Sequence, residues 1–214
     1  MSTATAGAGT VSGHANPVDG ARAAIYASVA RAISFPDEEL FDFVKSGGWS
    51  REFGDLSAEL PFRLTLAKNG SPTKNDYDAF QSEYIRLFEI GGRNGSPCPL
   101  HSGQYSRDRL QTLEDLLRFY TFFGLRAKTS FMPDHVAVEF EFMSYLAQQS
   151  AQAVPDSADA HSLRLAQRDF LTRRLAWWPE LAGRVRGQKP QTFYRILVTI
   201  TEKFLGLDLQ YLSQ

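Results

Sequence analysis

The sequence predicts an all-α, single-domain fold, and three observations support this prediction. Apolar residues recur at helical spacing in successive segments from residue 17 to the C-terminus. The sequence contains no segment of strand length with period-two alternation, and no internal repeat. With 214 residues, 43 % of them hydrophobic and including 16 Phe and 8 Tyr, the chain can bury one sizeable core.

Charge and cysteine content exclude several classes of protein. Lys and Arg total 23 against 24 acids, so no net charge directs the chain toward nucleic acid or a membrane surface. A single cysteine cannot form an intramolecular disulfide, which suits a reducing compartment. Residues 1–16 have neither the basic nor the apolar region of a secretory signal, and we interpret them as a disordered tail. No apolar run could span a bilayer, so we expect a cytoplasmic protein with one helical domain over residues 17–214.

The first three helices are predicted from apolar spacing and from Gly and Pro. Residues 17–33 form the first helix, because its Ile and Val residues share one face. A short helix follows over residues 37–46 and ends at two glycines. A third helix is expected over residues 49–68, with a kink near Pro61.

A stronger helix should begin near residue 73. Thr73 and Asp76 resemble a capping box at its start, and Gly91-Gly92 should end it. Its residues at helical spacing form an apolar stripe of Tyr77, Phe80, Tyr84, Leu87 and Phe88. On spacing alone, this stripe indicates core packing.

The second half of the chain is predicted to hold further helices. Residues 93–103 are too rich in Gly and Pro for regular structure, and a helix should follow from Tyr105 or Ser106 to Gly124. Its expected buried face consists of Leu110, Leu113, Leu117 and Tyr120. Pro133 suits the first position of a helix that is apolar nearly all round, which predicts a central place in a bundle. Helices are also expected over residues 157–177 and 191–207, with a break at Trp178-Pro179.

Asp134 and His135 follow Pro133 at the predicted start of the central helix. Asp134 would there interact with the positive end of the helix dipole. His135 lies beside this carboxylate and one turn before Glu139, so a proton shuttle, a metal ligand, a pH-sensitive contact and a structural histidine all remain open. Residues 130–160 contain five acids and no Lys or Arg, which makes this part of the chain acidic.

Cys98 and His101 form a Cys-x-x-His pair, which is half of a zinc site. The other half is missing, because the chain has no second cysteine, and we expect no metal. A hydrolase that uses Cys98 with His101 or His135 is one alternative function, and a purely structural helical adaptor is another. The glycines of residues 91–95 lack the Gly-Lys-Ser/Thr sequence and the preceding strand of a phosphate-binding loop.

Two elements of the chain resemble the TorD/DmsD/NarJ family of redox-enzyme maturation chaperones. They are an aromatic-x-x-Leu-Phe element at residues 84–88 and a Pro-Asp-His element at residues 133–135. Residues 97–105 are similar to the branch of this family that serves dimethyl sulfide and ethylbenzene dehydrogenases and chlorate and selenate reductases. Met132 departs from the family pattern, since many relatives carry Glu or another polar residue there, so contacts of that acid are not transferred to this chain.

The resemblance implies a chaperone without enzymatic activity and without a cofactor of its own. Such proteins bind the catalytic subunit of a molybdoenzyme of the dimethyl sulfoxide reductase family, or its twin-arginine signal peptide, until the molybdenum cofactor is inserted before export. A groove with aromatic walls and an acidic rim would complement a basic and then apolar segment. By resemblance, the client-binding residues are Tyr84, Leu87, Phe88, Pro133, Asp134, His135, Glu139 and Glu141, with Cys98 and His101 in a loop at the client or cofactor interface.

Within this set, Asp134, Glu139 and Glu141 are expected to face the arginines of the client. The family resemblance further implies a monomer or a domain-swapped dimer that binds no nucleic acid and does not insert stably into a membrane.

Overall fold

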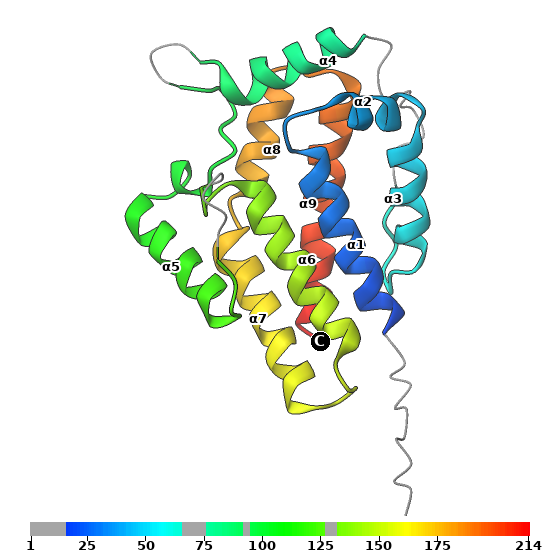
Figure 1. Ribbon diagram of the computed structural model, residues 1–214, viewed down its shortest axis with the longest axis vertical. Coiled ribbons are helices and arrows are strands. Elements are labelled where there is room, and N and C mark those ends of the chain that lie inside the picture. Colours follow the sequence, from blue (N-terminus) through cyan, green and yellow to red (C-terminus); the bar gives the residue numbers. More distant parts are fainter. Residues whose placement is uncertain (1–15, 66–75, 92–94, 127–131) are drawn as a thin grey trace, which may run out of the picture.

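The computed structural model describes residues 16–65, 76–91, 95–126 and 132–214. Within these ranges the chain forms nine α-helices, one π-helical turn and one 3₁₀ turn, and no strand, which confirms the all-α prediction (Figure 1). The elements are α1 (Pro17–Ala32), α2 (Glu38–Lys45), α3 (Gly48–Ala58), α4 (Tyr77–Tyr84), the π-helix η1 (Ile85–Glu89), the 3₁₀ turn η2 (Ser102–Gln104), α5 (Arg109–Phe122), α6 (Val136–Gln152), α7 (Ala158–Arg174), α8 (Trp178–Gly187) and α9 (Thr192–Leu212).

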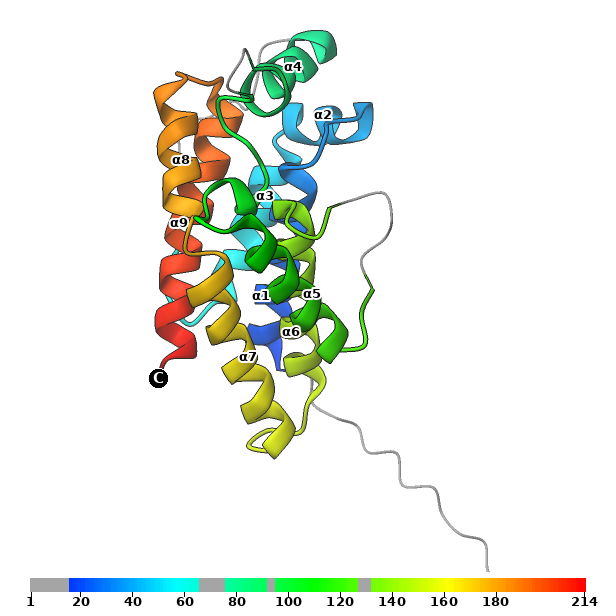
Figure 2. The same ribbon diagram turned by 90° about the vertical axis from the view of Figure 1, so that its left-hand side faces the viewer.

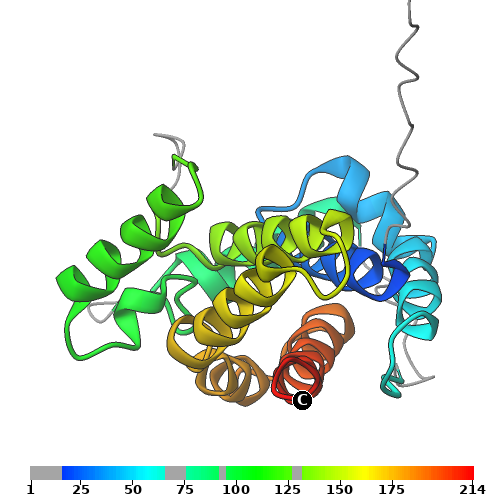
Figure 3. The same ribbon diagram turned by 90° about the horizontal axis from the view of Figure 1, so that it is seen from below.

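The core lies between α1, α6, α7 and α9. α6 packs along α1 on one side and α7 on the other, and α5 stands at the edge of the molecule (Figures 1 and 3). Phe140, Met143 and Leu146 of α6 are fully buried, which confirms the expected central helix. None of the described helices combines the length and the hydropathy that a membrane span requires.

Side chains that accept backbone N–H bonds mark several helix starts. Asn16, Asp37, Asp76, Asp108 and Ser157 accept from the first turns of α1, α2, α4, α5 and α7, in that order. Each thereby pairs an N–H group that the helix itself leaves without a partner. The starts of α1, α2 and α7 agree with the sequence prediction. Asn16 is the one described residue of the predicted tail.

The helix expected over residues 49–68 is shorter than predicted. α3 ends at Ala58, so Pro61 lies beyond the helix instead of kinking it. Proline removes a backbone donor and disfavours helical conformation in the residue before it, which explains the early end. Residues 66–68 lie outside the described residues.

The strong helix starts later than its apparent capping box. α4 begins at Tyr77, and the carboxylate of Asp76 accepts the N–H of Ala79 at 2.8 Å. Asp76 alone is therefore the cap. Thr73 and Gly92, the expected first and last signals of this helix, lie outside the described residues.

α5 buries only part of the face that the sequence predicted. The helix begins at Arg109, after the Asp108 cap, and its buried side chains are Thr112, Leu116 and Tyr120. Leu110 is 74 % exposed and Leu117 is 44 % exposed. Tyr120 is buried as predicted, and its hydroxyl donates to the Pro133 carbonyl in the turn that precedes α6, at 3.0 Å. Leu116, one turn before Tyr120 on the same face, is buried in place of Leu117.

Two prolines have other roles than predicted. α6 begins at Val136, because Pro133 and Asp134 form a turn and His135 caps the helix. Pro179 opens α8 instead of breaking the chain, since a proline is tolerated in the first turn of a helix. α9 continues past Leu207 to Leu212.

Candidate functional site

The first motif, the aromatic-x-x-Leu-Phe element of residues 84–88, lies where α4 ends and η1 begins. Tyr84 and Phe88 are almost fully buried, and Leu87 is fully buried. The rings of Tyr84 and Phe88 meet edge to face at 5.0 Å, and both contact the ring of Tyr194 in α9. The stripe therefore packs in the core, as its spacing predicted, and the π-helical turn is the kind of irregularity that is frequent at functional sites.

The second motif, the Pro-Asp-His element of residues 133–135, contacts the loop that follows the first motif in the chain. His101 and His135 form an isolated antiparallel bridge. The Ser102 N–H donates to the Asp134 carbonyl at 2.9 Å, and the Val136 N–H donates to the Leu100 carbonyl at 2.8 Å. These backbone contacts bring residues 98–104 against residues 134–136. We call this junction the loop–turn latch.

Asp134 anchors the latch through its side chain. Its Oδ1 lies 3.0 Å from His101 Nδ1, and its Oδ2 lies 3.7 Å from Arg109 Nε. Burial opposes ionisation, but the hydrogen bond and charge of His101, with Arg109 nearby, hold the pKa of Asp134 below its usual value. Asp134 is fully buried just before the His135 cap of α6, so the expectation that it faces a client's arginines is wrong.

His135 is half-buried and sits at the start of α6. Its Nδ1 accepts the N–H of Ala137 at 3.3 Å, and its ring meets that of His101 at 5.2 Å. Burial lowers the pKa of His135 to about 4. The side chain is therefore neutral near pH 7, which suits a structural contact at the wall of a site.

Glu139 and Glu141 occupy opposite environments on α6. Glu139 is fully buried, its Oε2 accepts from the indole N–H of Trp177 at 3.3 Å, and burial raises its pKa to about 8. It is therefore mostly protonated near pH 7, and the expectation that it faces arginines is also wrong. Glu141 is exposed.

A pocket of about 700 Å³ connects the two motifs. Its lining residues come from segments near the start of α6, at the end of the molecule where Figure 2 shows α2 and α4. The described residues that line it come from the end of α1, from η1, from the loop and from the turn before α6; they are Ser34, Phe35, Tyr84, Phe88, Glu89, Ser96, Pro99, Leu100, His101, Gln104, Met132 and His135. We call it the motif pocket.

Of the residues singled out from the sequence, Tyr84, Phe88, His101 and His135 line the motif pocket. The others lie behind it or away from it: Leu87, Cys98, Pro133, Asp134, Glu139 and Glu141. Phe35 and Glu89 are among the lining residues to which sequence reasoning gave no role. An exposed aromatic residue before a proline and an acid directly after the first motif were the available signals.

Cys98 has the properties of a core residue. It is fully buried, and its N–H donates to the Leu87 carbonyl at 3.1 Å. Burial raises the pKa of its thiol to about 11, so the thiolate nucleophile is scarce at neutral pH. Within the described residues, no three His, Cys, Asp or Glu side chains are grouped to hold a metal ion. The geometry does not support the hydrolase alternative.

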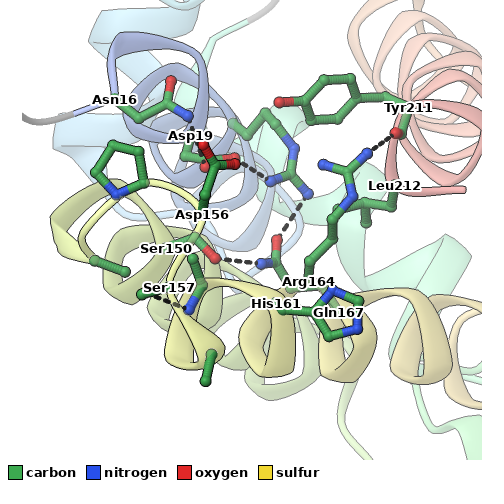
Figure 4. A pocket seen from close by; sticks show the side chains of 15 residues that line it. Asn16, Asp19, Ser150, Asp156, Ser157, His161, Arg164, Gln167, Tyr211 and Leu212 are labelled. Carbon is green, nitrogen blue, oxygen red and sulfur yellow. Dashed lines mark hydrogen bonds and ion pairs between the residues drawn. The ribbon is translucent and has the colours of Figure 1, made fainter. Parts of the chain in front are cut away.

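A second pocket, of about 550 Å³, lies at the opposite end of the bundle, and its polar groups bind one another (Figure 4). The buried guanidinium of Arg22 donates to Asp208 at 2.9 Å, to Gln167 at 2.7 Å and to Asp19 at 2.6 Å. Arg164 donates to the Tyr211 carbonyl and lies over its ring. These contacts tie α1, α7 and α9 together, so we assign the cluster a structural role.

The chain is similar to proteins that assemble other enzymes. Residues 49–182 match the family described as nitrate reductase delta subunit. The selenate reductase assembly chaperone of Thauera selenatis is 35 % identical over 165 residues, which cover 75 % of this chain and 74 % of that protein. The chlorate reductase assembly chaperone of Ideonella dechloratans is 34 % identical over 172 residues, or 77 % of each chain.

A solved structure shares the fold. It is a redox enzyme maturation protein from Archaeoglobus fulgidus, with a TM-score of 0.50 and 20 % identity, and the alignment covers 90 % of this chain and 94 % of that chain. At this identity the likeness concerns the fold alone. The family match and the similarity to the two chaperones show more than the fold. The resemblance of the two motifs to the TorD/DmsD/NarJ chaperones agrees with them. On these grounds the chain belongs to the nitrate reductase delta subunit family.

Proposed function

We propose that this protein is a non-enzymatic assembly chaperone, which binds the catalytic subunit of a molybdoenzyme and assists insertion of its molybdenum cofactor. The observation that carries this function is the motif pocket, in which both family motifs meet. Its wall is aromatic, and the neutral His135 is committed to capping α6. These properties suit the binding of a polypeptide segment better than chemistry on a substrate.

The motif pocket is the proposed contact for the client. Phe35 is 47 % exposed and Met132 is 45 % exposed, so both present apolar surface that a partner can cover. Tyr84 and Phe88 form the wall behind them. A twin-arginine signal peptide, with basic residues before an apolar run, is the segment we propose to enter the pocket.

The remaining motif residues act behind the pocket in this proposal. Asp134 holds His101, and Leu87 packs beneath Tyr84 and Phe88. The protein would act in the cytoplasm before the client is exported, as a monomer or a domain-swapped dimer. The proposed binding of the client by the motif pocket does not depend on the compartment or on the oligomeric state.

Capture of the client tests the proposal. An affinity-tagged chain, expressed in its own host, should co-purify with a large molybdoenzyme subunit that mass spectrometry identifies. Phe35→Ala should reduce the amount of captured subunit, because it removes exposed apolar surface at the pocket. Phe122→Ala is the matched control, since Phe122 is 83 % exposed but lies on α5, outside the motif pocket.

Two results would contradict the proposal. One is a wild-type chain that captures no molybdoenzyme subunit. The other is a Phe35→Ala chain that captures as much subunit as the Phe122→Ala control, which would place the client site elsewhere.

A further inference from the structure

The charge at the motif pocket comes from an unexpected residue. Of the three acids expected to meet a basic client, Asp134 and Glu139 are fully buried, and the exposed Glu141 does not line the pocket. His135 is neutral near pH 7, and His101 is engaged by the Asp134 carboxylate. Among the described residues that line the pocket, the exposed carboxylate belongs to Glu89.

Glu89 stands where the aromatic wall meets solvent. It is the last residue of η1 and directly follows Phe88. Burial raises the pKa of Tyr84, and the charge of Glu89 adds to this shift, so the carboxylate lies within electrostatic reach of the Tyr84 hydroxyl. The ring of Tyr84 in turn lies 5.4 Å from that of Phe35. The Glu89 carboxylate and the exposed apolar surface of Phe35 therefore lie at the same rim of the motif pocket.

Two described arginines near the rim in sequence are already paired with other acids. Arg86, on the same turn as Glu89, donates to Glu83 at 2.8 Å and 2.9 Å, and Arg31 is paired with Asp37 at 2.5 Å. A cation that approaches the pocket beside Glu89 therefore meets a carboxylate that these two arginines do not neutralise.

We infer that Glu89 is a specificity-determining residue of the motif pocket. It selects a client segment in which a bulky apolar side chain packs on Phe35 and Met132 while an adjacent arginine or lysine meets the Glu89 carboxylate. This inference rests on the proposed function and names the chemistry of the segment. Charge complementarity favours a basic and apolar segment over an acidic or a purely apolar one.

Peptide binding to the full chain tests the inference. The probe is a fluorescein-labelled synthetic peptide with two adjacent arginines followed by a run of leucines, and its partner probe carries glutamines in place of the arginines. Fluorescence anisotropy should show that Glu89→Gln weakens binding of the arginine peptide by about twofold to fivefold, the range expected of one exposed ion pair. Binding of the glutamine peptide should not change.

A matched control and a reversal sharpen the result. Glu52→Gln removes an exposed acid of α3 that does not line the pocket, and it should leave both affinities unchanged. Glu89→Arg should shift preference toward a peptide with two glutamates in place of the arginines. High salt should reduce the difference between wild type and Glu89→Gln, since exposed charges are screened.

The inference is overturned if the wild type does not prefer the arginine peptide, or if Glu89→Gln keeps the wild-type preference. Either result leaves the proposed function open to its own test, because capture of the molybdoenzyme subunit does not depend on these probes. Equal melting temperatures of wild type and Glu89→Gln would show that any loss of binding is not a loss of folding.

Discussion

At the scale of single residues, the partners of a buried motif side chain decide its charge. Asp134 and Glu139 are both fully buried carboxyls, yet their pKa values move in opposite directions. Asp134 has a histidine and an arginine within reach, and these favour its ionised form. Glu139 accepts a hydrogen bond from the indole N–H of Trp177, which is too weak to offset the cost of burying a charge.

The buried Glu139 predicts a pH-dependent stability. Its pKa is about 8 in the folded chain against 4.5 for an ordinary glutamate, so the folded state binds more protons between these values. Stability from this group is complete below pH 4.5 and is lost as the pH rises through 8. Glu139→Gln should therefore flatten the fall in unfolding free energy over this window, as urea denaturation at several pH values would measure. An unchanged pH profile would contradict the assignment.

Cys98→Ser should reduce stability without affecting client binding. A buried thiol behaves as a small apolar group, and a hydroxyl in its place would cost about 1–3 kcal/mol if no partner accepts it. Cys98 does not line the motif pocket, so peptide affinity should stay at the wild-type value. Denaturation curves and anisotropy separate the two effects. Rapid alkylation of the native thiol, or zinc that is lost in the variant, would contradict the structural role.

At the scale of elements, the loop–turn latch positions one wall of the motif pocket. Two backbone hydrogen bonds and the contact of the Asp134 carboxylate with His101 hold it, and each joins residues that are more than thirty positions apart in the chain. Gly103 permits this approach, because a Cβ there would lie 2.8 Å from Asp134 Oδ2 and 2.7 Å from Arg109 Cγ. Glycine is needed here for close contact, not for an unusual backbone angle.

Gly103→Ala should strain the latch and weaken the chaperone. The added methyl group would push the Asp134 carboxylate from His101, at a cost of about 1–3 kcal/mol for overpacking a buried site. Thermal unfolding should show a lower Tm, and affinity for the arginine peptide should fall because His101 and His135 move. Gly54→Ala is the matched control: its Cβ would meet nothing within 4 Å, so it should stabilise α3 by about 0.5–1 kcal/mol. Equal effects of the two substitutions would contradict the role of Gly103.

At the scale of the whole molecule, a buried ion pair joins the two ends of the chain. Arg22 of α1 and Asp208 of α9 are both fully buried and are linked by two hydrogen bonds. Tyr26 also donates to Asp208, at 2.7 Å, and Gln167 accepts from Arg22. The cluster therefore fixes α1, α7 and α9 at the end of the bundle opposite the motif pocket.

Asp208→Ala should destabilise the fold by about 3–5 kcal/mol, because it leaves the Arg22 guanidinium buried with fewer partners. Glu202→Ala, which breaks the more exposed pair of Glu202 with Arg186, should cost at most about 1 kcal/mol. Chemical denaturation of the two variants measures both values. If Asp208→Ala lowers the free energy of unfolding by less than about 1 kcal/mol, the cluster does not stabilise the fold as proposed.

Much of the helical architecture was predictable from local signals. Proline, glycine and capping side chains act within one turn, so the starts of α1, α2 and α7 were predicted correctly. The face of α5 was predicted only in part, because Tyr120 is buried as expected but Leu116 is buried in place of Leu110 and Leu117. Helical spacing permits either set of leucines, and the choice depends on packing around the turn before α6 that Tyr120 reaches.

The sequence by itself determined the all-α class, the central place of α6 and the two motifs that mark the family. These depend on spacing along the chain, which is a local property. Only the tertiary structure decided which residues face the motif pocket. It turned Asp134 and Glu139 inward and left Phe35 and Glu89 at the rim. Exposure depends on what packs over a side chain, and the residues that cover Asp134 and Glu139 come from segments far from them in sequence.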